Sequence, residues 1–142
     1  MLRAAVLFAP ADLRPLAERV AALLDRKRFR TTLKPASEAS ITDFSAADLV
    51  LLGSSSKGRS GLPEDFAEIL RALAGINLAG KVAGVFASDS DAPLTAWKKA
   101  LKDSEIRLEA NNLLRADTAE AAALTEWVGR LTGQLTEEAG EQ

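Results

Sequence analysis

The chain has 142 residues, with 18 basic and 20 acidic side chains and a formal net charge of −2, a size that suits one domain with a single core. It contains no cysteine and no histidine, which excludes disulfides, thiolate nucleophiles, Ser-His-Asp triads and histidine-ligated metals. Aromatic residues make up only 5% and the net charge is negative, so a nucleic-acid partner is not expected.

The first predicted element is a strand, because Ala4–Ala9 is a short continuous apolar run, typical of a strand buried on both faces. Pro10 breaks this run, and the charged residues Asp12 and Arg14 follow it. A bilayer span needs about 20 apolar residues, and the sequence has no run of that length. We therefore expect no membrane span, no export signal and a cytoplasmic protein.

Apolar runs and helical stripes then alternate along the chain. Apolar residues at helical spacing over residues 13–24 predict the first helix, with Asp12 as its N-cap. A second helix is expected to be missing or reduced to a turn within residues 37–45. The predicted strands are residues 3–9, 29–34, 47–53, 81–87 and 105–110.

Prolines and a glycine mark the later helices. Pro63 opens a helix that Gly75 can end with a positive φ, and Pro93 lies early in the next helix. The pattern Asp117-x-x-Glu120 resembles a capping box at the start of the last helix.

This alternation predicts an α/β three-layer sandwich, in which helices cover both faces of a five-stranded parallel sheet. The first, third and fourth strands are apolar throughout and belong in the centre, whereas the second and fifth carry polar positions and belong at the edges. Right-handed crossovers then give the strand order 2-1-3-4-5. We expect one domain over residues 1–136, followed by an acidic, disordered tail over residues 137–142. The predicted core includes Val6, Phe8, Val50, Leu52, Val85, Phe86, Trp97 and Trp127.

Two short motifs give the chain a resemblance to a known family. Residues 48–54 (DLVLLGS), with Pro63 downstream, are similar to the third strand and Gly-Ser turn of the flavodoxin family, and residues 78–81 (LAGK) are similar to its Gly-Lys entry to the next strand. The resemblance covers residues 3–135 and implies a flavodoxin-like fold with a site at the carboxyl ends of the strands, at the switch point between the first and third. In that family the site holds flavin mononucleotide (FMN), and its members carry electrons or reduce small acceptors.

The first loop of the implied site departs from the family pattern. A phosphate at this place needs backbone N–H groups and hydroxyls at the start of a helix. Residues 9–12 (APAD) contain no serine, threonine or glycine. Pro10 has no N–H group, and the carboxylate of Asp12 would repel a phosphate. The loops are therefore degenerate for flavin binding, and we expect weak FMN binding at most.

The second and third loops lack the aromatic residues that would cover a flavin ring. Trp97 is the nearest aromatic residue, and its place in a helical stripe predicts core packing. The second loop, residues 53–61, keeps a glycine turn and carries serines and two cations that suit a phosphate or carboxylate. The alternative is a solvated loop, since glycine and serine mark loops anyway. The candidate binding residues are Ser54, Ser55, Ser56, Lys57, Gly58, Ser88 and Asp89.

The sequence matches the motifs of other kinds of functional site only in part. The second loop reads G-x-x-x-x-G-R-S, close to a P-loop, but Pro63 starts the following helix too late for one. Asp89 and Asp91, with Asp12, are oxygen ligands of the kind Mg²⁺ takes, although acidic residues before a helix also favour its N-terminal dipole. Response-regulator receivers share the sheet order but need an aspartate where the third strand here ends in Gly-Ser, so that class is excluded. No catalytic constellation is visible, enzymatic activity stays open, and no metal site is expected.

The sequence thus predicts a flavodoxin-like domain that has lost tight flavin binding and acts as a small binding or interaction module, with a candidate anion site in the loop after the third strand. The alternative is an FMN-binding, flavodoxin-type electron-transfer or redox protein. No cofactor is expected, and FMN is the only specific candidate. The expected partners are a redox or regulatory protein and a small anionic ligand, with no nucleic acid and no membrane.

Overall fold

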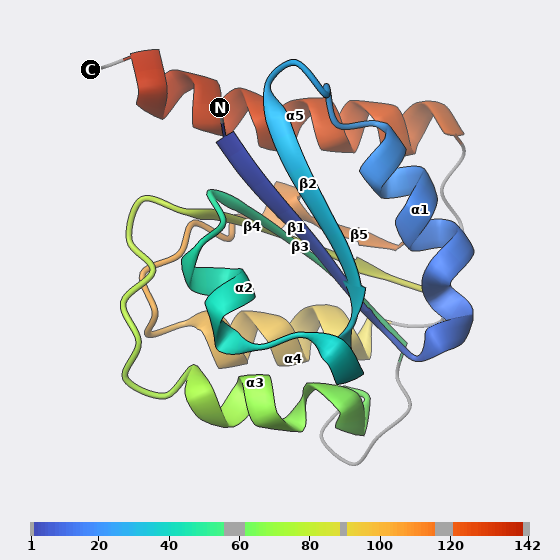
Figure 1. Ribbon diagram of the computed structural model, residues 1–142, viewed down its shortest axis with the longest axis vertical. Coiled ribbons are helices and arrows are strands. Elements are labelled where there is room, and N and C mark those ends of the chain that lie inside the picture. Colours follow the sequence, from blue (N-terminus) through green and yellow to red (C-terminus); the bar gives the residue numbers. More distant parts are fainter. Residues whose placement is uncertain (1, 56–61, 89–90, 116–120, 141–142) are drawn as a thin grey trace.

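A five-stranded parallel sheet forms the centre of the molecule (Figure 1). The computed structural model describes residues 2–55, 62–88, 91–115 and 121–140. The strands lie in the order β2-β1-β3-β4-β5, and every neighbouring pair is parallel. This order confirms the predicted flavodoxin-like α/β fold, in which the strands that are apolar throughout lie in the centre and those with polar positions lie at the edges. The strands are β1 (Leu2–Ala9), β2 (Phe29–Pro35), β3 (Leu49–Ser54), β4 (Val82–Ala87) and β5 (Leu113–Arg115).

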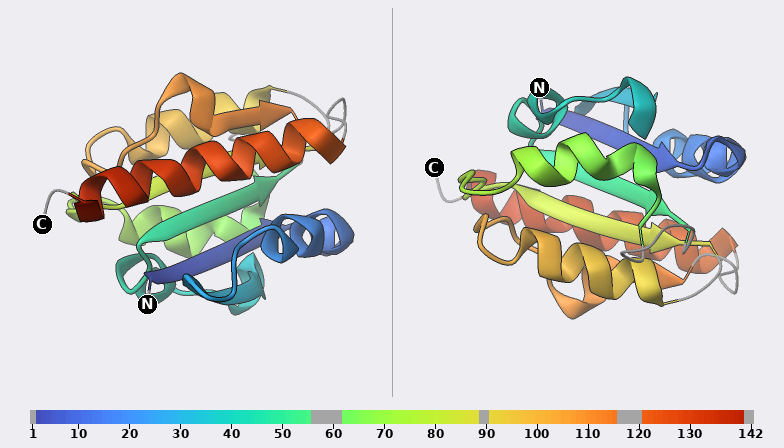
Figure 2. Two further views of the ribbon diagram at one scale, coloured as in Figure 1. Left: turned by 90° about the horizontal axis from the view of Figure 1, so that it is seen from above. Right: turned by 90° about the horizontal axis from the view of Figure 1, so that it is seen from below.

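Helices cover both faces of the sheet and complete a three-layer sandwich (Figure 2). One face carries the first and last helices, and the other carries the three helices between them. Short 3₁₀ segments precede three of the helices and the last strand; they are Ala11–Leu13, Ala36–Glu38, Glu64–Phe66 and Ala110–Asn112. The helices are α1 (Arg14–Ala22), α2 (Ile41–Ser45), α3 (Ala67–Ala72), α4 (Ala92–Leu101) and α5 (Ala121–Gly140).

Alternate residues of the central strands point into two separate apolar layers. On β3, Val50 and Leu52 pack against the layer of α2, α3 and α4, whereas Leu49 and Leu51 pack against the layer of α1 and α5. Each layer contains one tryptophan: Trp97 comes from α4 and Trp127 from α5. All eight side chains predicted for the core are buried, which confirms that part of the prediction.

A glycine in β4 lets α5 lie directly on the sheet. A Cβ atom built on Gly84 would lie 2.6 Å from the side chain of Leu131 and 2.9 Å from that of Leu51. Both distances are shorter than real Cβ contacts, so any larger residue would push the helix away from the strand. The glycine within the otherwise apolar run of β4 therefore has a packing reason.

The second helix is as short as the sequence predicts. α2 has only five residues, and its start is fixed by Asp43, whose Oδ2 accepts the backbone N–H of Ser40 at 2.8 Å. The other carboxylate oxygen of Asp43 forms an ion pair with Lys34 of β2 at 3.1 Å. Because α2 is short, it covers only a small part of the sheet near β1 and β2 (Figure 1).

Two predicted helix boundaries have different outcomes. The N-cap assigned to Asp12 is wrong: Asp12 lies inside the 3₁₀ turn before α1, and no side chain of the described residues caps that turn or the helix. Gly75 has a φ of 79° in the turn after α3, as predicted. The predicted capping box of Asp117 and Glu120 lies outside the described residues.

The fifth strand is displaced from its predicted position at residues 105–110. Only Arg107 bridges to β4 there, opposite Val82, and the ladder resumes in β5. The interruption is filled by Asn112, whose side-chain Nδ2 donates to the carbonyl of Ala83 at 2.8 Å. Alternating apolar residues predicted a continuous strand, but a side-chain amide here replaces one rung of backbone pairing.

The last helix continues to Gly140 and so overlaps residues 137–142, whose disorder stays a prediction. The single-domain assignment to residues 1–136 likewise stays a prediction. None of the described helices combines the length and the apolar character that a membrane span requires.

Candidate functional site

The carboxyl ends of β1, β3 and β4 meet at one edge of the sheet. Their last residues, Ala9, Ser54 and Ala87, are register partners. Beyond the strands, the N–H of Ser55 donates to the carbonyl of Ala9 at 3.3 Å, and the N–H of Ser88 donates to that of Ser54 at 3.2 Å. These bonds tie the starts of three loops together at the switch point between β1 and β3, where ligands bind in open α/β sheets.

Ser54, the first candidate binding residue, has its hydroxyl inside the core. The side chain is fully buried, and its Oγ accepts a hydrogen bond from Trp97 Nε1 at 2.9 Å. Trp97 is also fully buried and packs edge-on against Phe66, with ring centroids 4.9 Å apart, and beside Phe44 at 6.4 Å. The predicted core role of Trp97 is confirmed, so its ring is not exposed to cover a flavin.

The remaining candidate residues divide between the edge and the segments outside the described residues. Ser55 is 5% exposed and Ser88 is half-buried, and both lie directly after their strands. Their role in ligand binding stays a prediction. The other candidates, Ser56, Lys57, Gly58 and Asp89, lie outside the described residues.

Gly53 has a different role from the glycine turn that its sequence context predicts. It lies within β3 as the register partner of Phe86, and a Cβ atom on it would overlap the Phe86 ring. The absence of a side chain therefore lets the ring of Phe86 lie across β3, where it also packs edge-on against Trp127 at 6.1 Å.

The loop after β1 offers a phosphate few donors. Ala11 and Asp12 begin the 3₁₀ turn, so their N–H groups have no acceptor inside it. Pro10 has no N–H group, and its carbonyl accepts the N–H of Leu13 at 3.0 Å. No hydroxyl lies in this loop, and Asp12 is exposed at its entrance. These residues fit the phosphate of FMN poorly.

Arg14 is a cation at this edge that is not among the predicted binding residues. It is the first residue of α1, and its Cζ lies 5.1 Å from the centroid of the Phe8 ring. The side chain is exposed, so its charge partly offsets that of Asp12 for an approaching anion. The available signal was a cation two residues after Asp12, at the start of a helix.

Asp91, the acidic residue before α4 that the structure describes, is held by an ion pair, whereas Asp89 lies outside the described residues. Asp91 is the N-cap residue of α4, and its carboxylate forms an ion pair with Arg115 of β5 at 3.2 Å. Among the described residues, no three acidic side chains come together as metal ligands. Asp91 thus joins α4 to the edge strand.

The fold is that of solved flavodoxins. A short-chain flavodoxin associated with a bacterial microcompartment matches with a TM-score of 0.80 and 20% identity, covering 95% of this chain and 99% of the other. A flavodoxin of Streptococcus pneumonia TIGR4 matches with a TM-score of 0.80 and 19% identity, covering 93% and 99%. A Fusobacterium nucleatum flavodoxin bound to flavin mononucleotide matches with a TM-score of 0.74 and 10% identity, covering 94% and 99%. Neither a family model nor a curated protein sequence matches this chain.

Proposed function

We propose that this chain is a flavodoxin-type electron carrier that takes FMN with low affinity at the carboxyl edge of β1, β3 and β4. The observation that carries the proposal is the joining of three loops at the switch point, through the hydrogen bonds from Ser55 to Ala9 and from Ser88 to Ser54. The proposal is supported by the structural alignments, in which this chain covers 99% of each of two flavodoxins and therefore has room for the same domain. A bound flavin would supply the redox chemistry, and the protein would set its position and affinity.

The low affinity follows from the loop after β1. Hydrogen bonds to a charged group contribute about 1.5–3 kcal/mol each, and this loop supplies no hydroxyl and no N–H at Pro10. The buried indole of Trp97 cannot cover the ring either. The proposal therefore includes loss of the cofactor during purification.

The test compares FMN with riboflavin, which carries the same ring without a phosphate. The protein is purified without added flavin, its visible spectrum is recorded, and each flavin is then titrated while its fluorescence is followed. We expect a colourless or pale protein that binds FMN weakly, within about tenfold of riboflavin, because the phosphate contributes little. If neither FMN nor riboflavin binds, the electron-carrier proposal is contradicted. If FMN binds tightly and riboflavin does not, the proposed low affinity is contradicted.

A second candidate function is an interaction module that binds no flavin. The observation favouring it is the burial of Trp97 and Phe86, since neither ring is free to cover a ligand at this edge. Such a module would use the loop after β3 for a small anion or a regulatory protein. It predicts that neither flavin binds and that a partner is recovered with the purified chain in pull-downs. A cytoplasmic location is common to both candidates.

A further inference from the structure

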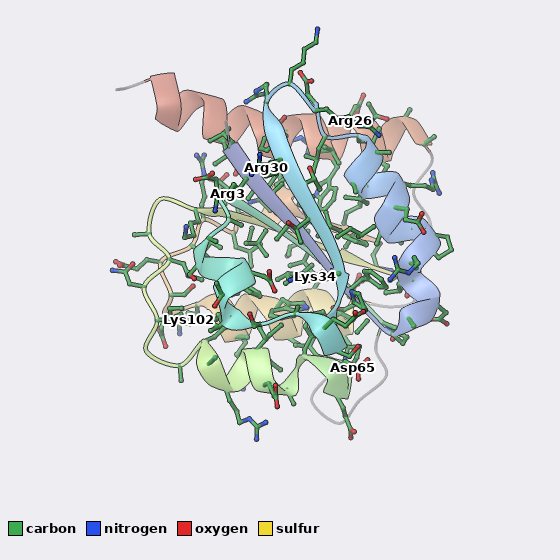
Figure 3. The ribbon with its side chains drawn as sticks, viewed as in Figure 1. Arg3, Arg26, Arg30, Lys34, Asp65 and Lys102 are labelled. Atoms are coloured by element: carbon green, nitrogen blue, oxygen red, sulfur yellow. The ribbon has the colours of Figure 1, made fainter. Side chains whose placement is uncertain are left out.

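Two arginines lie side by side on the sheet, at the end opposite the candidate flavin edge. Arg3 of β1 and Arg30 of β2 are register partners near the starts of their strands, and both side chains are exposed. Register partners point to the same face of a sheet, so the two guanidinium groups share one surface (Figure 3). Like charges in directly opposed positions repel each other and lower stability.

The two arginines border a hollow of about 220 Å³. Thr32, the next residue of β2 on the same face, and Asp43 also line it, and the end of α2 closes one side at residues 46–47. α2 has only five residues, and Arg3, Arg30 and Thr32 stay exposed on the face of the sheet that it packs against. The volume of the hollow is below the range typical of pockets that bind drug-sized ligands, so the hollow suits a small chemical group.

The neighbouring carboxylates are already engaged. Asp43 pairs with Lys34 at 3.1 Å, and Asp48 accepts the backbone N–H of Arg3 at 2.9 Å. No ion pair joins the guanidinium group of Arg3 or Arg30 to a carboxylate among the described residues. The hollow therefore presents two guanidinium groups that no ion pair joins to a carboxylate of the described residues, together with the hydroxyl of Thr32. The carboxylate of Asp48 lies near Arg3, where it accepts a neutral N–H group, so its charge offsets part of theirs.

We propose that this hollow binds a phosphate group, held by the guanidinium groups of Arg3 and Arg30 and by the hydroxyl of Thr32. Guanidinium groups match phosphate oxygens in paired hydrogen bonds, and two of them balance a dianion. The rigid backbone of two paired strands holds the arginines next to each other before the ligand arrives. The site is independent of the proposed flavin function, because it lies at the other end of β1.

The test follows thermal unfolding while inorganic phosphate replaces sodium chloride at constant ionic strength. Four proteins are compared: the natural chain, Arg3→Gln, Arg30→Gln and the control Arg26→Gln, which removes an equal charge away from the hollow (Figure 3). We expect phosphate to raise the unfolding midpoint of the natural chain and the control. Each variant in the hollow should bind phosphate roughly tenfold or more weakly, because a charged hydrogen-bonding partner is lost.

A second signature separates binding from a structural role. Without phosphate and at low salt, Arg30→Gln should be at least as stable as the natural chain, because the repulsion between the two arginines is gone. In the natural chain, the Nε–Hε resonances of Arg3 and Arg30 should shift together as phosphate is added. Equal effects of phosphate on all four proteins, or no effect beyond that of chloride, overturn the proposal, as do unmoved arginine resonances.

Titration with glycerol 3-phosphate in the same series distinguishes free phosphate from a phosphate ester. Stabilisation by the ester that depends on Arg3 and Arg30 assigns the hollow to esters as well. Stabilisation by inorganic phosphate alone assigns it to the free ion. Both results support a phosphate site, since each requires the two arginines.

Discussion

The side-chain amides of Asn112 and Gln134 hydrogen-bond each other in both directions. Asn112 Nδ2 donates to Gln134 Oε1 at 3.3 Å, and Gln134 Nε2 donates to Asn112 Oδ1 at 3.0 Å. Both residues are buried, with 0% and 7% of their surface exposed. Because Asn112 also donates to the carbonyl of Ala83, the pair joins α5 to the interrupted edge of the sheet. Partnered amides of this kind are tolerated in a core, whereas a single unpaired amide is not.

Replacing Asn112 with alanine should therefore destabilise the fold. The substitution leaves the carbonyl of Ala83 and the amide of Gln134 without this partner in a buried environment. We expect the free energy of unfolding to fall by about 2–3 kcal/mol. Urea denaturation measures the change, and Asn111→Ala is the matched control because Asn111 is exposed. Equal effects at the two positions would contradict the role assigned to Asn112.

Removing the hydroxyl of Ser54 should expose the dependence of Trp97 on its partner. Ser54→Ala leaves a buried indole N–H without its acceptor, and we expect a loss of about 1–3 kcal/mol. In a Trp97→Phe background the same substitution should cost much less, because no N–H remains to be satisfied. A double-mutant cycle by chemical denaturation gives the coupling energy. Additive effects would show that the hydrogen bond contributes nothing.

Gly84 should be intolerant of even a single methyl group. The Cβ of Gly84→Ala would meet Leu131 and Leu51 at distances that only a shift of α5 relieves, so we expect a loss of about 1–3 kcal/mol. Gly129→Ala is the control, because this glycine is exposed within α5 and has open space around it. That change should raise stability by about 0.5–1 kcal/mol through helix propensity. Thermal unfolding of the two variants should therefore move in opposite directions.

Restoring phosphate donors to the loop after β1 should strengthen FMN binding. The double variant Pro10→Ser, Asp12→Thr adds two hydroxyls and one N–H and removes a carboxylate. We expect at least about a tenfold gain in affinity for FMN, and little change for riboflavin, which has no phosphate. Flavin fluorescence titration measures both constants. A gain of the same size for riboflavin would show that the loop acts through the ring rather than the phosphate.

The sheet order and the two core layers could be predicted from the sequence because burial on both faces leaves continuous apolar runs, as in Val82–Ala87. The displaced edge strand could not. Ile106 and Leu108 alternate with polar residues as a strand would, and nothing local shows that Asn112 takes over one rung of the ladder. The replacement of a backbone hydrogen bond by the Asn112 side chain depends on where α5 places Gln134, which lies far along the chain.

The candidate site was predictable in position but not in detail. The Gly-Ser pair that ends β3 correctly indicated the edge where the loops meet. Both residues have packing roles instead, because the ring of Phe86 fills the space beside Gly53 and the hydroxyl of Ser54 accepts a hydrogen bond from Trp97. A polar residue beside a loop predicts a ligand contact only when no buried donor from another element reaches it first.

The placement of one tryptophan in each layer makes the protein its own optical probe. The chain has two tryptophans and no tyrosine, so fluorescence excited at wavelengths that phenylalanine does not absorb reports only these two positions. Trp97 Nε1 donates a hydrogen bond to Ser54, whereas Trp127 Nε1 has no partner among the described residues. Two versions of the chain with one tryptophan each, Trp97→Phe and Trp127→Phe, would follow the two halves of the core separately. Coincident transitions would mean that the layers on opposite faces of the sheet melt as one cooperative unit.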